Sequence, residues 1–155
     1  MTARILVPHD GSKWSDKAVR QAVEHAKLLK DAEIILFYVV PEVHPPPSFS
    51  YGMRLPDVKS TKEYLKELYQ QMKGDAAEML NRKKQEFTEG GVNSVRIKVS
   101  VGNPVEQILA MATAEKADLI IIGSIGRSGI TRLKNLGSVS RSVSERAPCP
   151  VMIVH

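Results

Sequence analysis

Apolar and polar positions alternate along this chain of 155 residues with two different periods. Short aliphatic runs indicate strands of a buried parallel sheet, and apolar residues at helical spacing indicate helices that pack against it. The expected strands cover residues 5–7, 34–40, 95–101, 118–122 and 151–154. The expected helices begin near Ser12 or Ser15, at Ser60, at Pro104 and at Gly137. The helix from Ser60 runs to Glu89, with Leu65, Leu68, Met72, Ala76, Leu80 and Phe87 on its buried side.

The resulting order βαβαβαβαβ predicts an α/β protein. Right-handed crossovers between parallel strands convert it into a three-layer α/β/α sandwich. Residues 95–101 alternate with period two and are expected at a sheet edge with one face in water. Prolines crowd residues 41–57, so this loop is expected to be irregular. The length suits one domain over residues 1–155.

Composition excludes several classes of protein. No apolar stretch approaches the roughly 20 residues of a membrane span, and the N-terminus is too short in its apolar part for a signal peptide. The single cysteine, Cys149, excludes an internal disulfide, so the cytoplasm is the expected compartment. The net charge is +5, but the basic residues are spread along the chain and the aromatic residues are scattered. Nucleic-acid binding is therefore not expected.

The glycines that follow residues 118–122 carry the most specific chemistry. Gly123 and Gly126 lie just past the carboxyl end of a central strand, where open α/β sheets bind ligands. There they are expected to take positive φ and to turn backbone N–H groups toward an anion. Gly137 and Ser138 would add a helix N-terminus and a hydroxyl, or would merely start a helix. Arg127 either faces phosphates or is an ordinary surface charge.

A second polar segment, from Pro8 to Ser12, follows the first strand. If the first and fourth strands are neighbours, their connections leave toward opposite faces and open a crevice. Asp10 could hold ribose hydroxyls there, or could serve as a turn residue that bonds its own backbone. A catalytic triad of His9, Asp10 and Ser12 is not expected, because sequence neighbours seldom point at one another.

The two segments together predict a nucleotide site. The sequence contains no GxxxxGK[ST] motif, which excludes a P-loop enzyme. It also has no GxGxxG near the first strand, which argues against the usual dinucleotide fold. The four histidines lack metal-ligand spacing, so no metal site built from protein side chains is expected.

Taken in order, these residues resemble the universal stress protein family. The likeness spans nearly the whole chain and includes residues 5–12, 37–40, 102–104, 117–124, 137–140 and 147–151. The resemblance implies a five-stranded parallel sheet of order 3-2-1-4-5. It also implies a homodimer formed partly through the C-terminal strand. The family divides into ATP-binding members and members that lack the glycine motif.

The resemblance also implies a ligand and its contacts. Asp10 would hold the ribose of ATP, and backbone groups around Pro8 and Val39 would meet adenine. The phosphates, with Mg²⁺, would lie against Gly123, Gly126, Arg127, Gly137, Ser138 and Val139. ATP-binding members carry G-x2-G-x9-G-[ST], whereas ten residues, Arg127 to Leu136, separate Gly126 from Gly137 here.

The expected function is that of an ATP-binding regulatory protein of the stress response. One alternative is a nucleotide-free dimeric interaction module, which the longer glycine loop would favour if it closed the pocket. Another is a slow ATPase that uses the same pocket. Fast catalysis is not expected, because no evident water-activating carboxylate follows the glycine segment.

Overall fold

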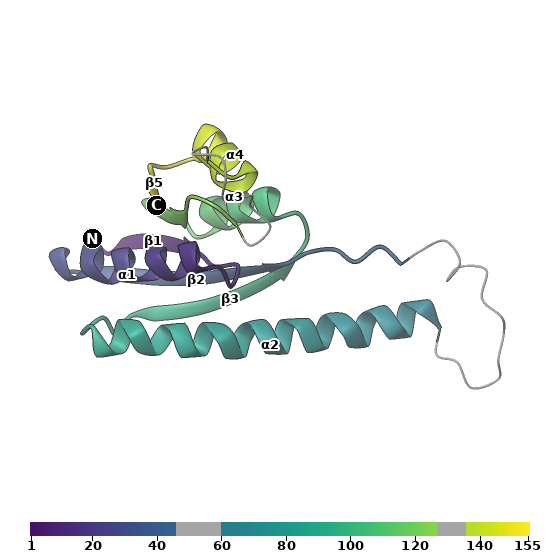
Figure 1. Ribbon diagram of the computed structural model, residues 1–155. Coiled ribbons are helices and arrows are strands. Elements are labelled where there is room, and N and C mark those ends of the chain that lie inside the picture. Colours follow the sequence, from purple (N-terminus) through teal and green to yellow (C-terminus); the bar gives the residue numbers. More distant parts are fainter. Residues whose placement is uncertain (46–59, 127–135) are drawn as a thin grey trace.

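Five parallel strands form one sheet in the order β3-β2-β1-β4-β5 (Figure 1). The computed structural model describes residues 1–45, 60–126 and 136–155. The strands are β1 (Ala3–Pro8), β2 (Ala32–Val40), β3 (Val95–Val101), β4 (Leu119–Gly123) and β5 (Val151–Val154). The helices are α1 (Lys13–Leu28), α2 (Thr61–Glu89), α3 (Pro104–Ala114) and α4 (Ser138–Arg146). The predicted element order, strand order and edge position of β3 are confirmed.

Helices cover both faces of the sheet, because successive side chains of a strand point to opposite sides. Ile5 and Val7 of β1 belong to the core under α1 and α2. Leu6, which lies between them, belongs to the core under α3 and α4. All three side chains are almost completely buried. The aliphatic runs of the sequence therefore correspond to strands that are buried on both faces, as in other parallel sheets.

Polar side chains fix where the helices begin. Ser12 caps α1 by accepting a hydrogen bond from the backbone N–H of Ser15, so the cap is Ser12 and not Ser15. Ser60 and Glu63 form a reciprocal capping box at α2. Asn103 caps α3, and Pro104 occupies its first turn as predicted.

The long helix α2 is buried only in its second half. Ala76, Leu80 and Phe87 are buried, whereas the predicted core residues Leu65, Leu68 and Met72 are only partly buried. Figure 1 shows the reason: the first half of α2 extends beyond the sheet. The prediction of a continuous buried stripe was therefore wrong for this half. Apolar spacing reports the side of a helix but not how far the sheet reaches.

The neighbouring strands β1 and β4 are followed by connections on opposite faces of the sheet, which leaves room for a site at their carboxyl ends. β1 and β4 pair in parallel, with Ile5 opposite Leu119 and Leu6 opposite Ile120. The chain leaves β1 toward α1 on one face and leaves β4 toward α4 on the other. Residues 46–59, which include most of the predicted proline loop, lie outside the described part of the chain. Among the described residues, no helix combines the length and apolar character that crossing a bilayer requires.

Candidate functional site

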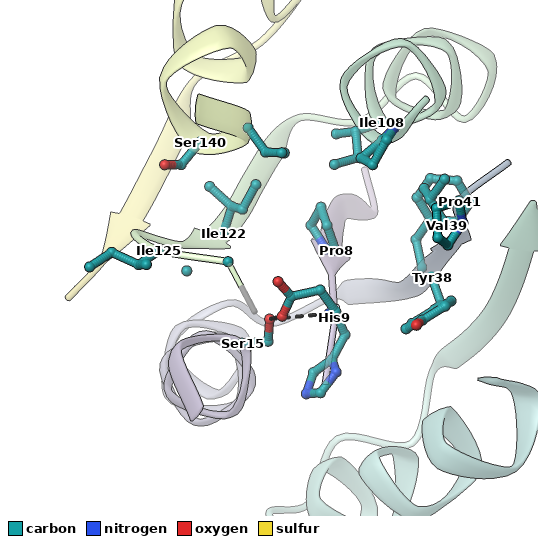
Figure 2. A pocket seen from close by; sticks show the side chains of 16 residues that line it. Pro8, His9, Ser15, Tyr38, Val39, Pro41, Ile108, Ile122, Ile125 and Ser140 are labelled. Carbon is teal, nitrogen blue, oxygen red and sulfur yellow. Dashed lines mark hydrogen bonds between the residues drawn. The ribbon is translucent and has the colours of Figure 1, made fainter. Parts of the chain in front are cut away.

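A cavity of about 300 Å³ opens where β1 and β4 end (Figure 2). Its volume is at the lower end of the range for small-molecule sites, and its position is the predicted switch point of the sheet. The lining comes from three strands, three helices and the loops beside them. It consists of Pro8, His9, Asp10, Ser15, Phe37, Tyr38, Val39, Pro41, Pro104, Ile108, Ile122, Gly123, Ile125, Gly126, Val139 and Ser140.

The cavity has an apolar side and a side formed by the start of α4. Val39, Pro41 and Ile108 gather on one side of Figure 2, with Pro8 near the middle. Ser140 lies on the opposite side, at the beginning of α4. Such a cavity can accept a flat apolar group at one side and a polar or anionic group at the other.

The turn after β1 presents the carboxylate of Asp10 to this cavity. Asp10 Oδ1 accepts the backbone N–H of Ser12 at 2.9 Å and the hydroxyl of Ser15 at 2.6 Å. Gly11 takes a φ of +85°, which lets the chain reverse without steric strain. Asp10 Oδ2 faces Gly126 and would lie 3.0 Å from a Cβ added there. Asp10 is therefore both a turn residue and a wall of the cavity.

The prediction of positive φ at Gly123 and Gly126 was wrong. Among the described glycines, positive φ occurs at Gly11, Gly91 and Gly102, but not at Gly123, Gly126 or Gly137. What matters at these three positions is instead the space that a missing side chain leaves. At Gly126 that space separates the glycine segment from Asp10.

Gly123 serves the packing of α1 against β4. A Cβ added to Gly123 would lie 2.7 Å from the carbonyl carbon of Trp14 in the first turn of α1. The indole ring of Trp14 has two ammonium groups over it, from Lys13 at 4.9 Å and Lys17 at 4.5 Å from its centroid. Gly123 lines the cavity, but its lack of a side chain is needed on the helix side.

The start of α4 offers backbone donors next to Gly126. α4 geometry leaves the N–H groups of Ser138, Val139 and Ser140 without intrahelical acceptors, and Gly137 provides no capping side chain. The N–H of Gly137 itself donates to the carbonyl oxygen of Ser124 at 2.8 Å, so it is already satisfied internally. Ser140 Oγ donates to the same carbonyl at 2.8 Å and anchors this end of α4 to β4.

The structure brings most of the predicted site residues together. Those that line the cavity are Pro8, Asp10, Val39, Gly123, Gly126 and Val139. Gly137 lies beside it, because a Cβ there would come within 3.5 Å of the backbone nitrogen of Gly126. Ser138 is exposed at the first position of α4 and does not line the cavity. Arg127, like the rest of 127–135, lies outside the described residues.

A sequence profile of the universal stress protein family matches residues 1–155. The chain belongs to the universal stress protein family. Universal stress protein MJ0531 of Methanocaldococcus jannaschii is 35% identical to it over 151 residues, which cover 97% of this chain and 81% of that protein. The solved structure of MJ0577 from the same organism matches with a TM-score of 0.81 at 29% identity, covering 99% of this chain and 96% of that one. A universal stress protein solved in complex with cAMP matches with a TM-score of 0.64 at 25% identity, covering 99% of this chain and 96% of that one.

Within this family fold, several lining residues were not predicted from the sequence. Sequence reasoning assigned Ile108 no role beyond the helix predicted from Pro104, and it assigned Ser15 none beyond a possible helix start. Helical periodicity could not indicate that Ile108 lies at the end of the core that borders the cavity. Ser140 rather than Ser138 lines the cavity, because two positions along a helix rotate a side chain to another face.

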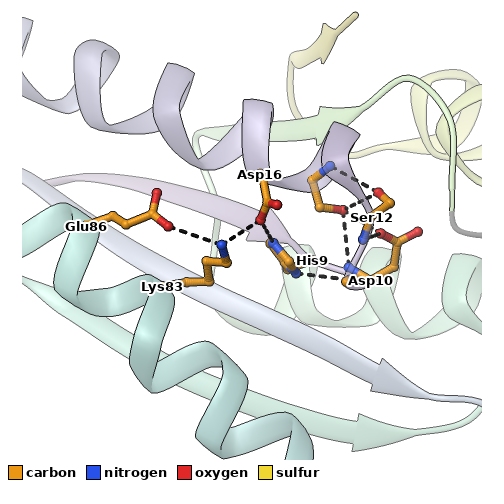
Figure 3. Close-up of polar contacts among 8 residues, drawn as sticks. His9, Asp10, Ser12, Asp16, Lys83 and Glu86 are labelled. Atoms are coloured by element: carbon orange, nitrogen blue, oxygen red, sulfur yellow. Dashed lines mark hydrogen bonds and ion pairs between the residues drawn. The ribbon is translucent and has the colours of Figure 1, made fainter.

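The most informative residue that sequence reasoning passed over is His9. Its side chain is almost fully buried beneath Asp10, and both ring nitrogens are engaged (Figure 3). Nδ1 accepts the backbone N–H of Gly11 at 3.1 Å, and Nε2 lies 2.9 Å from Asp16 Oδ1. Because Nδ1 accepts, the ring proton is on Nε2, which donates to Asp16.

Asp16 connects His9 to helix α2. Lys83 Nζ lies 2.7 Å from Asp16 Oδ1 and 3.1 Å from Glu86 Oε1. Partial burial opposes the charged form of Asp16, but hydrogen bonds from Lys83 and His9 hold its pKa below the usual value. Burial likewise opposes charge on Lys83, yet its bonds to Asp16 and Glu86 raise its pKa. Asp16 and Lys83 are therefore both charged at neutral pH.

Proposed function

We propose that this universal stress protein binds ATP in the cavity between β1 and β4, and that ATP occupancy regulates its partners during stress in the cytoplasm. The observation that carries the proposal is that Asp10, Gly126 and the start of α4 meet at one cavity. A carboxylate suits ribose hydroxyls, and uncapped helix N–H groups suit phosphate. A relative solved with cAMP supports an adenine nucleotide as the ligand class.

Each part of the nucleotide has a counterpart in the cavity. Adenine would lie between Pro8, Val39 and Ile108, where the lining is apolar. Ribose would reach Asp10 Oδ2, which faces the cavity beside Gly126. The phosphates would then lie over Gly126, near the N–H groups of Ser138 and Val139, with Gly123 and Gly137 flanking this end. The internally bonded N–H of Gly137 would not contribute.

Magnesium would enter with the nucleotide. The described residues contain no group of three or more His, Cys, Asp or Glu side chains arranged to bind a metal ion. Mg²⁺ commonly takes its ligands from phosphates, water and one or two carboxylates. This chain therefore suits Mg²⁺ as part of an ATP complex.

ATP–Mg²⁺ should stabilise the folded protein against heat. A ligand present at a hundred times its Kd contributes about 2.7 kcal/mol through linkage, which raises the melting temperature by several degrees. Differential scanning fluorimetry with ATP, ADP, AMP and cAMP would measure the shift and rank the ligands. No shift with any of them would contradict the proposal and favour a nucleotide-free interaction module.

Asp10→Asn is the matched variant for the ribose contact. The asparagine keeps Oδ1 as the acceptor for Ser12 and Ser15, so the turn is preserved while the negative charge is lost. Hydrogen bonds to a charged group contribute about 1.5–3 kcal/mol, so affinity should fall roughly tenfold to a hundredfold. Titration calorimetry would measure this loss. An unchanged Kd would remove Asp10 from the ribose contact.

We further propose that the protein forms a homodimer through β5. This strand lies at the edge of the sheet, and its residues are all partly exposed. The carbonyl oxygens of Pro150 and Val154 accept hydrogen bonds from the backbone N–H groups of Ile120 in β4 and of Ser124 directly after β4. Because a parallel strand alternates its bonding direction, Ile153 directs its backbone groups to the open edge.

Ile153→Pro should separate the dimer. Proline removes the outward N–H but is tolerated at an edge position, so the monomer should still fold. Light scattering after size exclusion should give twice the chain mass of 17.1 kDa for the wild type and the single mass for the variant. A wild-type monomer, or a variant that is still dimeric and folded, would contradict an interface through this edge.

A further inference from the structure

His9 links the proposed nucleotide site to a charged network behind it. The ring supports Gly11 through Nδ1, and Gly11 directly follows Asp10 in the turn. On its other side the ring reaches Asp16 of α1, and through Asp16 it reaches Lys83 of α2. Only 4% of His9 is exposed, so it cannot exchange these partners for water while the turn keeps its shape.

The hydrogen bond from Gly11 makes the turn sensitive to the charge of His9. Neutral imidazole has one nitrogen that accepts and one that donates, which matches Gly11 and Asp16. Protonated imidazole has two donors and no acceptor. The Gly11 N–H and a protonated Nδ1 would then be two donors about 3.1 Å apart, which is repulsive. The turn that carries Asp10 would have to open.

We propose that His9 is a positioning residue: its neutral form holds the Asp10–Gly11 turn ready for the nucleotide ribose, and protonation releases the turn and weakens binding. This inference rests on the proposed nucleotide site. It adds to that site a response to acidification, controlled by the buried ring of His9, whose two nitrogens are bonded to Gly11 and Asp16.

The charged groups around His9 determine the pH at which release occurs. Burial lowers the pKa of His9 below its usual value of 6.5, and the positive charge of Lys83 lowers it further. The carboxylates of Asp16 and Asp10 act in the opposite direction without reversing the shift. His9 is therefore neutral at pH 7, and binding should weaken only as the pH falls below about 6.5.

The binding test uses cAMP as the probe. Its phosphodiester does not titrate between pH 7.5 and 5, whereas a phosphomonoester would, with a second pKa near 6. For the wild type, log affinity should fall by up to about one unit per pH unit once the pKa of His9 is passed. His25→Asn on α1 is the matched control, because His25 lies outside the cavity lining, and it should keep the wild-type profile.

Two substitutions of His9 separate its two bonds. In His9→Asn, the amide oxygen lies near the position of Nδ1 and can still accept the N–H of Gly11, but the side chain does not titrate. The affinities of this variant at pH 7.5 and at pH 5 should therefore be nearly equal. In His9→Gln, the amide nitrogen lies near the position of Nε2, so the variant keeps the bond to Asp16 and loses the bond to Gly11. Its affinity for cAMP should be low at both pH values. A flat wild-type profile, or the wild-type slope persisting in His9→Asn, would overturn the proposal.

Lys83 provides a test outside the cavity. Lys83→Met removes a positive charge that disfavours imidazolium, so the pH below which the affinity for cAMP begins to fall should be higher than in the wild type. Lys83→Arg keeps the charge and should leave this pH near the wild-type value. If this pH is the same in Lys83→Met as in the wild type, the role of the network is overturned. Because Lys83 does not line the cavity, a direct effect on ligand contacts cannot produce this shift.

A measurement on the free protein distinguishes a failure of this proposal from a failure of the proposed nucleotide site. In ¹⁵N NMR spectra of the free protein, His9 should titrate below pH 6.5 from the Nε2–H tautomer, and the Gly11 amide should shift in parallel. If the Gly11 amide does not respond when His9 titrates, the positioning role is wrong even where nucleotide binds. If it responds but no nucleotide binds at any pH, the nucleotide site alone fails.

Discussion

Gly126→Val should weaken nucleotide binding by at least about a hundredfold without unfolding the protein. A Cβ at this position already lies 3.0 Å from Asp10 Oδ2, and the two valine methyl groups would fill the gap between the glycine segment and the carboxylate. Phosphate and ribose would both lose their approach, because only glycine leaves the backbone open here. Calorimetry with ATP–Mg²⁺ would measure the affinity.

Circular dichroism and thermal denaturation would serve as the folding control for this variant. Gly126 does not have positive φ, so a side chain does not strain the backbone itself. Gly126→Ala, which adds the Cβ alone, should have a smaller effect. Wild-type affinity in Gly126→Val would show that no ligand passes between Gly126 and Asp10.

Gly123→Ala should act on stability rather than on binding. The added methyl group would lie 2.7 Å from the carbonyl carbon and 2.9 Å from the carbonyl oxygen of Trp14, and a helix backbone cannot move aside as a flexible side chain can. Overpacking of this kind lowers the free energy of unfolding by roughly 1–3 kcal/mol, occasionally more. Urea denaturation should show a lower midpoint with an unchanged slope.

Gly74→Ala is the matched control for Gly123→Ala. Gly74 lies within α2, and a Cβ there would meet nothing within 4 Å. Alanine favours a helix over glycine by about 1 kcal/mol, so this variant should be as stable as the wild type or more stable. Equal stability of Gly123→Ala and the wild type would mean that α1 can shift away from β4 at little cost.

Hydrophobic spacing predicted the fold well because the central strands β1, β2 and β4 are buried on both faces. Ile5, Leu6 and Val7 form a continuous apolar run for that reason, and the turn residues after them mark its end. The strand order depended on the resemblance to a family, since spacing alone does not indicate which parallel strands are neighbours. The partial burial of Leu65 could not be predicted, because it depends on where the sheet ends beneath α2.

The sequence predicted where the candidate site lies, but not which contacts each of its residues makes. Gly123 and Gly126 look equivalent in sequence, yet the missing side chain of Gly123 points toward Trp14 and that of Gly126 toward Asp10. The role of His9 was hidden for another reason. Its partner network includes Lys83, which is far away in sequence and comes close only because α1 and α2 share one face of the sheet.

The packing of Trp14 against Gly123 has an optical consequence. Trp14 is the only tryptophan in the sequence, so the indole emission of the protein comes from this one ring. The backbone of Trp14 lies against Gly123 at the end of β4. The ammonium groups of Lys13 and Lys17 lie over its indole ring. The chain thus carries a single intrinsic fluorophore on the residue whose backbone packs against Gly123, a lining residue of the cavity, so the unmodified protein can be tested for a fluorescence response to nucleotides.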